Sequence, residues 1–147
     1  MDFEEIDPLQ AHKLLNQGGY VYLDVRTVEE FAQGHPAGAR NVPVMIRDPG
    51  TGQMTPNPEF VRVVEAHFSK QTALLVGCRS GGRSAAACQF LAQAGYTQLW
   101  NVNGGFHGRA LPPGITFIKG WAACELPVEN DLSDEKSYAA LRAKAGL

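Results

Sequence analysis

Hydrophobic residues along the chain fall into short continuous runs separated by stretches with helical spacing. Runs rich in β-branched or aromatic residues predict buried strands at 20–25, 72–76 and 98–102. A shorter run at 39–42, stopped by Pro43, predicts a further brief strand. Because helical stretches separate these strands, the sheet should be mostly parallel and the fold class α/β.

Capping signals predict where the helices begin. Asp7 is followed by proline and, three residues on, by glutamine, which favours a helix start. Thr27 and Glu30 form a capping box that opens a short helix. Further helices are expected after a cap at Asn57-Pro58-Glu59, over 85–94, and from 133 near the C-terminus. The polar stretch from Arg47 to Pro58 is predicted to be a loop, long enough to act as a lid.

Length and composition indicate one ordinary globular domain. A chain of 147 residues buries about 70% of its unfolded surface, so it can build a core without disulfides. The net charge of −2 gives no electrostatic reason to expect nucleic acid or an anionic membrane as partner. No apolar run approaches the ~20 residues that span a bilayer.

The cysteines and the N-terminus suggest a compartment. Three cysteines form no CxxC pair and no Cys/His metal spacing, so we expect reduced thiols, no metal and no cofactor. The acidic start at 1–5 lacks the pattern of a signal peptide. From these features we expect a cytoplasmic protein.

The segment 78–84, Cys-Arg-Ser-Gly-Gly-Arg-Ser, carries the candidate chemistry. It lies between a predicted strand and a predicted helix, which puts Cys78 at the carboxyl edge of the sheet, where backbone N–H groups and a helix dipole favour anions. Gly81 and Gly82 let the backbone curl into a concave nest of N–H donors. Arg79 and Arg83 add positive charge, so the loop favours a thiolate and an anionic ligand.

The other two cysteines give weaker signals. Cys88 lies mid-helix among alanines, where a buried structural cysteine is expected. The pattern around Cys124 does not decide its role.

Three segments resemble the rhodanese-like domain family. Residues 24–43 are similar to the family's opening signature, 78–84 to its active-site loop in single-domain members, and 103–106 to its closing segment. Trp121 and Leu126-Pro127 extend that last similarity. The resemblance covers roughly 7–128. It divides the chain into a rhodanese-like domain at 1–128 and a tail at 129–147 that holds a short helix.

The resemblance implies a small parallel sheet with helices on both faces and a sulfurtransferase activity. Cys78 would take sulfane sulfur from thiosulfate, a small anionic donor, and hold it as a persulfide. It would then pass the sulfur to cyanide or a thiol, including a thiol of another protein. The residues expected to bind the donor are Arg79, Ser80, Gly81, Gly82, Arg83 and Ser84. Asp24 and Arg26 are expected to be structural residues near this site.

One departure and two alternatives qualify this interpretation. The family's closing tryptophan usually follows the paired glycines closely, whereas residues 106–120 form an insertion before Trp121 that can rim the site.

A cysteine phosphatase or arsenate reductase shares the loop shape, but those enzymes have five residues between cysteine and arginine. Here four residues separate Cys78 from Arg83. A non-catalytic sulfur-carrier or regulatory module is the second alternative, although inactive relatives usually lack the cysteine.

Overall fold

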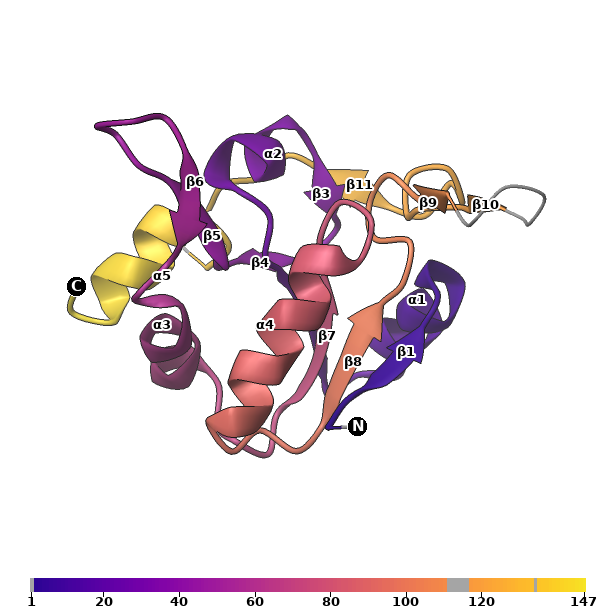
Figure 1. The fold of residues 1–147 in the computed structure, drawn as a ribbon. Coiled ribbons are helices and arrows are strands. Elements are labelled where there is room, and N and C mark those ends of the chain that lie inside the picture. Colours follow the sequence, from indigo (N-terminus) through magenta and orange to yellow (C-terminus); the bar gives the residue numbers. More distant parts are fainter. Residues whose placement is uncertain (1, 111–116, 134) are drawn as a thin grey trace.

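A five-stranded parallel sheet forms the centre of the protein, as the alternation of strands and helices predicts (Figure 1). The structure is a computed structural model that describes residues 2–110, 117–133 and 135–147. In spatial order the strands are β1 (Glu4–Ile6), β8 (Leu99–Val102), β7 (Ala73–Gly77), β2 (Tyr20–Asp24) and β4 (Arg40–Asn41). The carboxyl ends of all five strands therefore meet at one edge.

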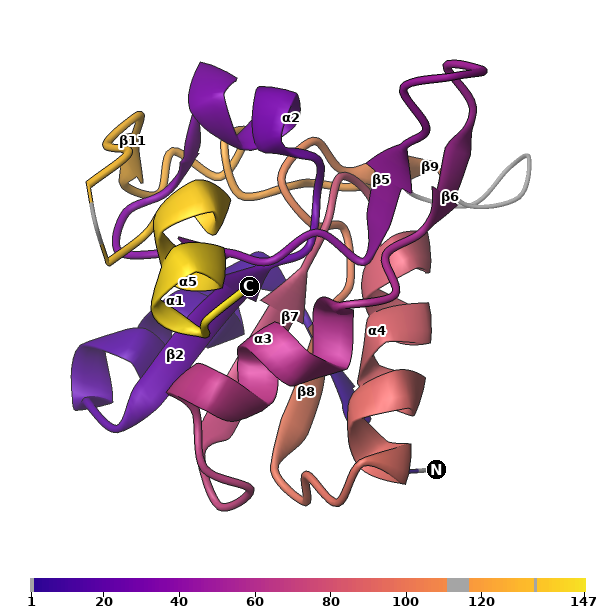
Figure 2. The same cartoon turned by 90° about the vertical axis from the view of Figure 1, so that its left-hand side faces the viewer.

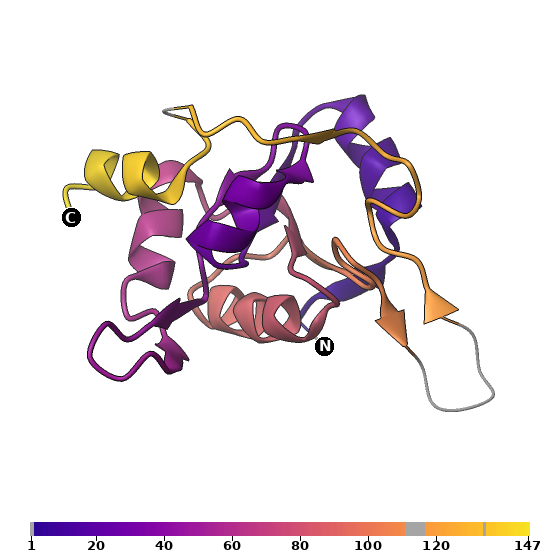
Figure 3. The same cartoon turned by 90° about the horizontal axis from the view of Figure 1, so that it is seen from above.

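Helices cover both faces of this sheet (Figures 2 and 3). They are α1 (Pro8–Gln17), α2 (Val28–Gln33), α3 (Phe60–His67), α4 (Gly82–Gln93) and α5 (Tyr138–Lys144). Successive strand residues point to opposite faces. Leu74 and Val76 pack in a core with α3, α4 and α5, whereas Leu75 packs in a second core with α1. The α/β prediction with two covered faces is confirmed.

The capping signals give correct helix starts in three of the four places. Asp7 with Gln10 and Thr27 with Glu30 both form complete capping boxes. The segment Asn57-Pro58-Glu59, predicted to cap the third helix, does so: Glu59 is the cap residue, and the Asn57 side chain accepts its N–H in the turn before it. The last helix starts at Ser137 and not at 133, since a turn closed on the Ser133 carbonyl precedes it.

Two strand regions differ from the sequence-based expectation. The edge strand β1 was not predicted, because Glu4 and Glu5 interrupt its apolar pattern and charged side chains are common on edge strands. The predicted loop at 47–58 is largely a hairpin, in which β5 (Met45–Arg47) pairs antiparallel with β6 (Met54–Pro56). This hairpin lies outside the main sheet, so the buried-strand pattern is absent from it.

The C-terminal third adds two small ribbons and a packed helix. Within the insertion 106–120, β9 (Arg109–Ala110) pairs with β10 (Phe117–Ile118). Residues 111–116, which join these two strands, lie outside the described residues. The second ribbon pairs β3 (His35–Pro36) with β11 (Val128–Glu129).

Helix α5 belongs to the same core as the sheet. Leu141 is buried in that core, and the Arg142 guanidinium donates to the Glu59 carboxylate at the start of α3. The tail 129–147 therefore contributes packing contacts to the domain. Over the ranges the structure describes, every helix is too short or too polar to cross a bilayer.

Candidate active site

Cys78 follows the last residue of β7 and lies ahead of α4, at the carboxyl edge of the sheet. It is buried, with 2% of its surface exposed. The turn between strand and helix brings the Gly81 N–H to 3.1 Å from the Cys78 sulfur, and this N–H donates to it. The sulfur thus lies on the concave side of the loop, as the strand–turn–helix pattern predicts.

Residues 104–107, at the closing segment, fix the direction of the peptide groups in the loop 78–84. The N–H groups of Phe106, His107 and Gly104 donate to the carbonyls of residues 78, 79 and 80, at 2.8, 2.8 and 2.9 Å. In a trans peptide, the C=O and the following N–H point in opposite directions. The N–H groups of residues 79–81 therefore point away from the closing segment, and the Gly81 N–H is the one that donates to the sulfur.

Gly105 lets the closing segment approach the loop this closely. A Cβ at this position would lie 2.3 Å from the Cys78 carbonyl oxygen and 2.8 Å from the Arg79 carbonyl carbon. These neighbours are backbone atoms, so no flexible side chain is available to move aside. A side chain at 105 would therefore push the cysteine loop out of position.

The two glycines within the loop have different roles. Gly81 has a φ of +131°, in the region that side chains disfavour. Gly82 begins α4, and a Cβ there would meet no atom within 4 Å. The expectation that both glycines are needed to curl the backbone is therefore correct for Gly81 and wrong for Gly82.

Ser84 brings a hydroxyl group to the sulfur from the first turn of α4. Its Oγ lies 3.4 Å from the Cys78 sulfur, and the residue is fully buried. The same hydroxyl lies 2.5 Å from the side-chain oxygen of Asn101 on β8. The Asn101 amide in turn donates to the Glu5 carboxylate on β1. Asn101 and Glu5 were not predicted as site residues, because no local pattern joins them to the loop.

Arg83 is held by an ion pair and does not point freely into solvent. Its guanidinium donates to both Glu30 carboxylate oxygens, at 2.7 and 3.0 Å, which links α4 to α2. Burial alone would raise the pKa of Glu30, but the Arg83 and Thr27 hydrogen bonds outweigh it and lower that pKa to about 2. A donor anion that uses Arg83 must share it with this carboxylate.

Arg79 and His107 lie at the outer side of the loop. Both are exposed, and across the described ranges no ion pair to Arg79 is present. Partial burial and the charges of Arg79 and Arg26 lower the pKa of His107, which favours its neutral form. Ser80 is half-buried, and its carbonyl is the group held by Gly104.

Asp24 and Arg26 form a buried pair beneath the site. The Arg26 guanidinium donates to both Asp24 oxygens and also to the Gly34 carbonyl at 2.8 Å. It lies 4.4 Å from the centre of the Phe106 ring, next to the closing segment. The pair thus ties the end of β2 to two loops, which fits a structural role.

The remaining cysteines are separate from the loop. Cys88 is fully buried on α4, and burial, followed by the charges of Glu5 and Cys78, raises its pKa to about 12. Such a thiol stays protonated and unreactive. Cys124 is partly exposed. Over the residues that are described, no group of His, Cys, Asp or Glu side chains is arranged to hold a metal ion.

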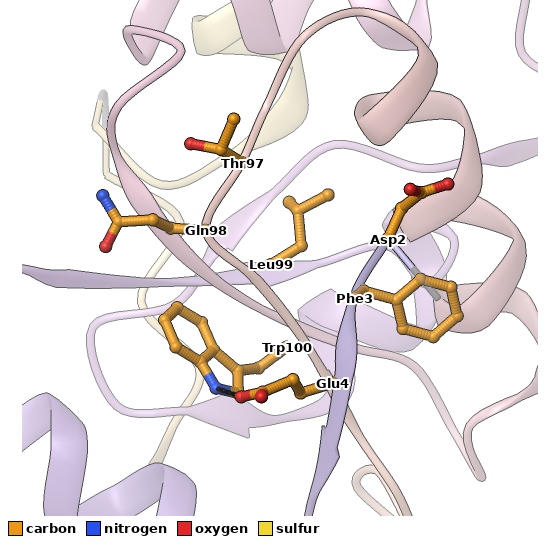
Figure 4. Close-up of a pocket in the computed structure, with 7 residues that line it drawn as sticks. All are labelled: Asp2, Phe3, Glu4, Thr97, Gln98, Leu99 and Trp100. Atoms are coloured by element: carbon orange, nitrogen blue, oxygen red, sulfur yellow. Dashed lines mark hydrogen bonds between the residues drawn. The ribbon is translucent and has the colours of Figure 1, made fainter.

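Two surface hollows differ in their relation to this loop. One of about 290 Å³ adjoins Arg83 and has an almost wholly apolar lining, formed by Val44, Met45, Pro56, Gly82, Arg83, Ala86 and Phe90. A larger one of about 400 Å³ lies at the opposite edge of the sheet, between the starts of β1 and β8 (Figure 4). The side-chain hydrogen bond drawn there joins the Trp100 indole N–H to Glu4. The larger hollow therefore offers little chemistry.

Comparison with known proteins agrees with the geometry. The family model for the rhodanese-like domain matches residues 7–109. The chain belongs to the rhodanese-like domain family. The matched range includes the opening signature and the whole Cys78 loop, and it ends inside the insertion. Two relatives that are named thiosulfate sulfurtransferases support a sulfurtransferase family.

Two plant relatives are informative. The chain is 49% identical over 96 residues to Thiosulfate sulfurtransferase 16, chloroplastic, from Arabidopsis thaliana, covering 65% of this chain and 78% of that protein. It is 42% identical over 122 residues to Rhodanese-like domain-containing protein 15, chloroplastic, from the same plant, covering 83% of this chain and 59% of the relative. The chloroplastic names contradict the expected cytoplasmic location, which was wrong because reduced cysteines do not distinguish one reducing compartment from another.

A solved structure supports the fold. The crystal structure of Rv0390 from M. tuberculosis superposes with a TM-score of 0.70 at 29% identity, covering 87% of this chain and 98% of that one. A further relative, 40% identical over 105 residues, is named Protein HIGH ARSENIC CONTENT 1, mitochondrial, from Arabidopsis thaliana; the match covers 71% of this chain and 60% of that protein.

Proposed function

We propose that the protein is a thiosulfate sulfurtransferase that carries sulfur as a Cys78 persulfide. The observation that supports this most is the orientation of the loop peptides, with three carbonyls held outward and the Gly81 N–H donating to the sulfur at 3.1 Å. Aligned N–H donors stabilise a negatively charged sulfur. The relatives named as thiosulfate sulfurtransferases favour the same reaction.

The reaction needs two displacements at sulfur. The Cys78 thiolate attacks the outer sulfur of thiosulfate, the S–S bond breaks, and sulfite leaves with the bonding pair. An acceptor, cyanide or a thiolate, then attacks the outer persulfide sulfur and releases the Cys78 thiolate. Because only 2% of Cys78 is exposed, donor and acceptor have to approach the sulfur end-on. The cradle of residues 79–84 stabilises charge on the sulfur in both steps.

Mass spectrometry after incubation with thiosulfate tests this proposal. We expect Cys78 to gain one sulfur atom and to lose it when cyanide is added. Cys78→Ser should abolish both the mass change and thiocyanate formation while the circular dichroism spectrum stays unchanged. Cys88→Ala is the matched control, because that thiol is buried away from the cradle. Sulfur found on Cys88 or Cys124 instead would refute the assignment.

Turnover assays with different substrates separate the two alternatives. A cysteine phosphatase or arsenate reductase would turn over an aryl phosphate or arsenate, and a loop with four residues between Cys78 and Arg83 disfavours wrapping such an ion. A non-catalytic carrier would accept sulfur once without multiple turnovers. We expect multiple turnovers with thiosulfate and cyanide, and none with the aryl phosphate.

A further inference from the structure

Behind the loop, a chain of hydrogen bonds runs from the Cys78 sulfur to the protein surface. Ser84 and Asn101 are buried, at 0% and 2% exposed, whereas Glu5 is exposed on the edge strand β1. The chain crosses α4, β8 and β1, so three elements converge on one serine hydroxyl. Buried polar groups of this kind are costly unless they are fully paired, which makes their orientation specific.

The Glu5 carboxylate, together with a longer contact to the Gly81 carbonyl at 3.3 Å, sets the direction of this chain. A carboxylate only accepts hydrogen bonds, so the Asn101 amide N–H₂ faces it, at 3.0 Å from both oxygens. The Asn101 side-chain oxygen therefore faces Ser84. That oxygen is the nearest acceptor to the Ser84 hydroxyl, at 2.5 Å, against 3.2 Å for the Gly81 carbonyl and 3.4 Å for the sulfur.

A serine hydroxyl has one hydrogen, and this geometry commits it to Asn101. Ser84 then presents a lone pair to the Cys78 sulfur, which suits a protonated thiol as donor. A thiolate or a persulfide anion would need the hydroxyl hydrogen turned toward it. The orientation of Ser84 therefore affects how readily the sulfur carries negative charge.

We infer that Glu5 and Asn101 are positioning residues that hold the Ser84 hydroxyl away from the Cys78 sulfur in the resting protein. Ser84 turns to the sulfur when the thiolate or the persulfide forms. The inference rests on the proposed sulfur transfer at Cys78. Other ionisable groups interact electrostatically with Cys78 as well, namely Tyr22 from β2 and Arg83 and Cys88 from α4, so the test must isolate the Glu5 contribution.

The experiment measures the rate of Cys78 alkylation by iodoacetamide as a function of pH, in a Cys88→Ala, Cys124→Ala background. Glu5→Gln lets the Asn101 amide turn round, because a glutamine side chain can also donate. We expect this variant to be alkylated about tenfold to a hundredfold faster below neutral pH, the effect of gaining one hydrogen bond to an ionised group. Glu4→Gln is the matched control, since it removes the same charge from the neighbouring residue of β1.

A double-mutant cycle distinguishes the hydrogen-bond chain from simple charge removal. In a Ser84→Ala background, Glu5→Gln should no longer change the alkylation profile. A Glu5 effect that persists without the Ser84 hydroxyl, or that Glu4→Gln reproduces, overturns the inference. Because alkylation needs no sulfur donor, this readout stays valid if thiosulfate fails to load Cys78, so failure of the proposed function is recognised separately.

Discussion

The two ends of the parallel sheet differ in what they offer a ligand. At the carboxyl ends, a tight turn places a nearly buried sulfur against an oriented N–H group and a serine hydroxyl. At the amino ends, the hollow beside Trp100 is larger, about 400 Å³, but it contains one surface hydrogen bond and no converging donors (Figure 4). The comparison shows that the direction of backbone groups, and not the size of a hollow, locates the chemistry. Parallel strands produce this asymmetry, because helix N-termini follow only their carboxyl ends.

Disturbing the backbone at the carboxyl end should have the largest effect. Gly105→Ala puts a methyl group 2.3 Å from the Cys78 carbonyl oxygen, so the loop has to shift. A displacement near 1 Å can cost about a hundredfold in rate, and we expect at least that loss in kcat/KM for thiosulfate. Steady-state kinetics at constant folded fraction measure it. Gly82→Ala is the comparison variant and should lose much less, because its Cβ meets open space. Equal losses would contradict the account of the tethered loop.

Removing a charge beside the loop should have a smaller effect. Arg83→Ala takes away a guanidinium from the first turn of α4, and we expect a loss of roughly 1–3 kcal/mol in transition-state stabilisation for thiosulfate, as for a charge-assisted contact. The measurement is kcat/KM for thiosulfate at fixed cyanide. Arg62→Ala, an arginine on α3 away from the loop, is the control. Full activity in Arg83→Ala would mean that Arg83 is engaged by the Glu30 carboxylate and does not bind the donor.

The Glu30–Arg83 pair also predicts a dependence of stability on pH. The folded protein lowers the pKa of Glu30 from 4.5 to about 2, so the pair stabilises the fold above pH 4.5, and this stability is lost as pH falls toward 2. Urea unfolding at neutral and acid pH should show a smaller acid-induced loss for Glu30→Gln than for the wild-type protein. Glu29→Gln, its exposed neighbour on α2, should behave like the wild type. If Glu30→Gln were as sensitive to acid as the wild-type protein, the Glu30–Arg83 pair would not be a source of the pH-dependent stability.

Changes at the amino end of the sheet should have the smallest effect. Glu4→Gln weakens the hydrogen bond to the Trp100 indole at the surface, and we expect a stability change within about 0.5 kcal/mol and unchanged sulfur transfer. Thermal unfolding and the thiocyanate assay check the two parts. A clear loss of activity in Glu4→Gln would break the contrast between the two ends.

Local signals in the sequence predicted what depends on neighbouring residues. The capping boxes at Asp7 and Thr27 and the strand–turn–helix around Cys78 depend on contacts within a few positions, and each was correct. The hairpin of β5 and β6 was not predicted, since it lies outside the core and has no apolar pattern.

Contacts between distant residues could not be predicted in this way. Glu30 and Arg83 are 53 positions apart, and Glu5 and Asn101 are 96 apart. Which polar side chains meet depends on the strand order, which places β1 beside β8 and β7 beside β2. The sequence therefore indicated the candidate nucleophile and its loop, but not the side chains that hold Arg83 and Ser84.

The hydrogen bonds from the N–H groups of residues 104, 106 and 107 to the carbonyls of residues 78–80 have a consequence for protein engineering. Grafting the seven-residue loop 78–84 alone onto another scaffold would transfer the cysteine without the partners that aim its peptide groups. A working transplant needs two segments, taken from neighbouring strands and kept in register. A peptide that copies only the loop should therefore behave as an ordinary thiol.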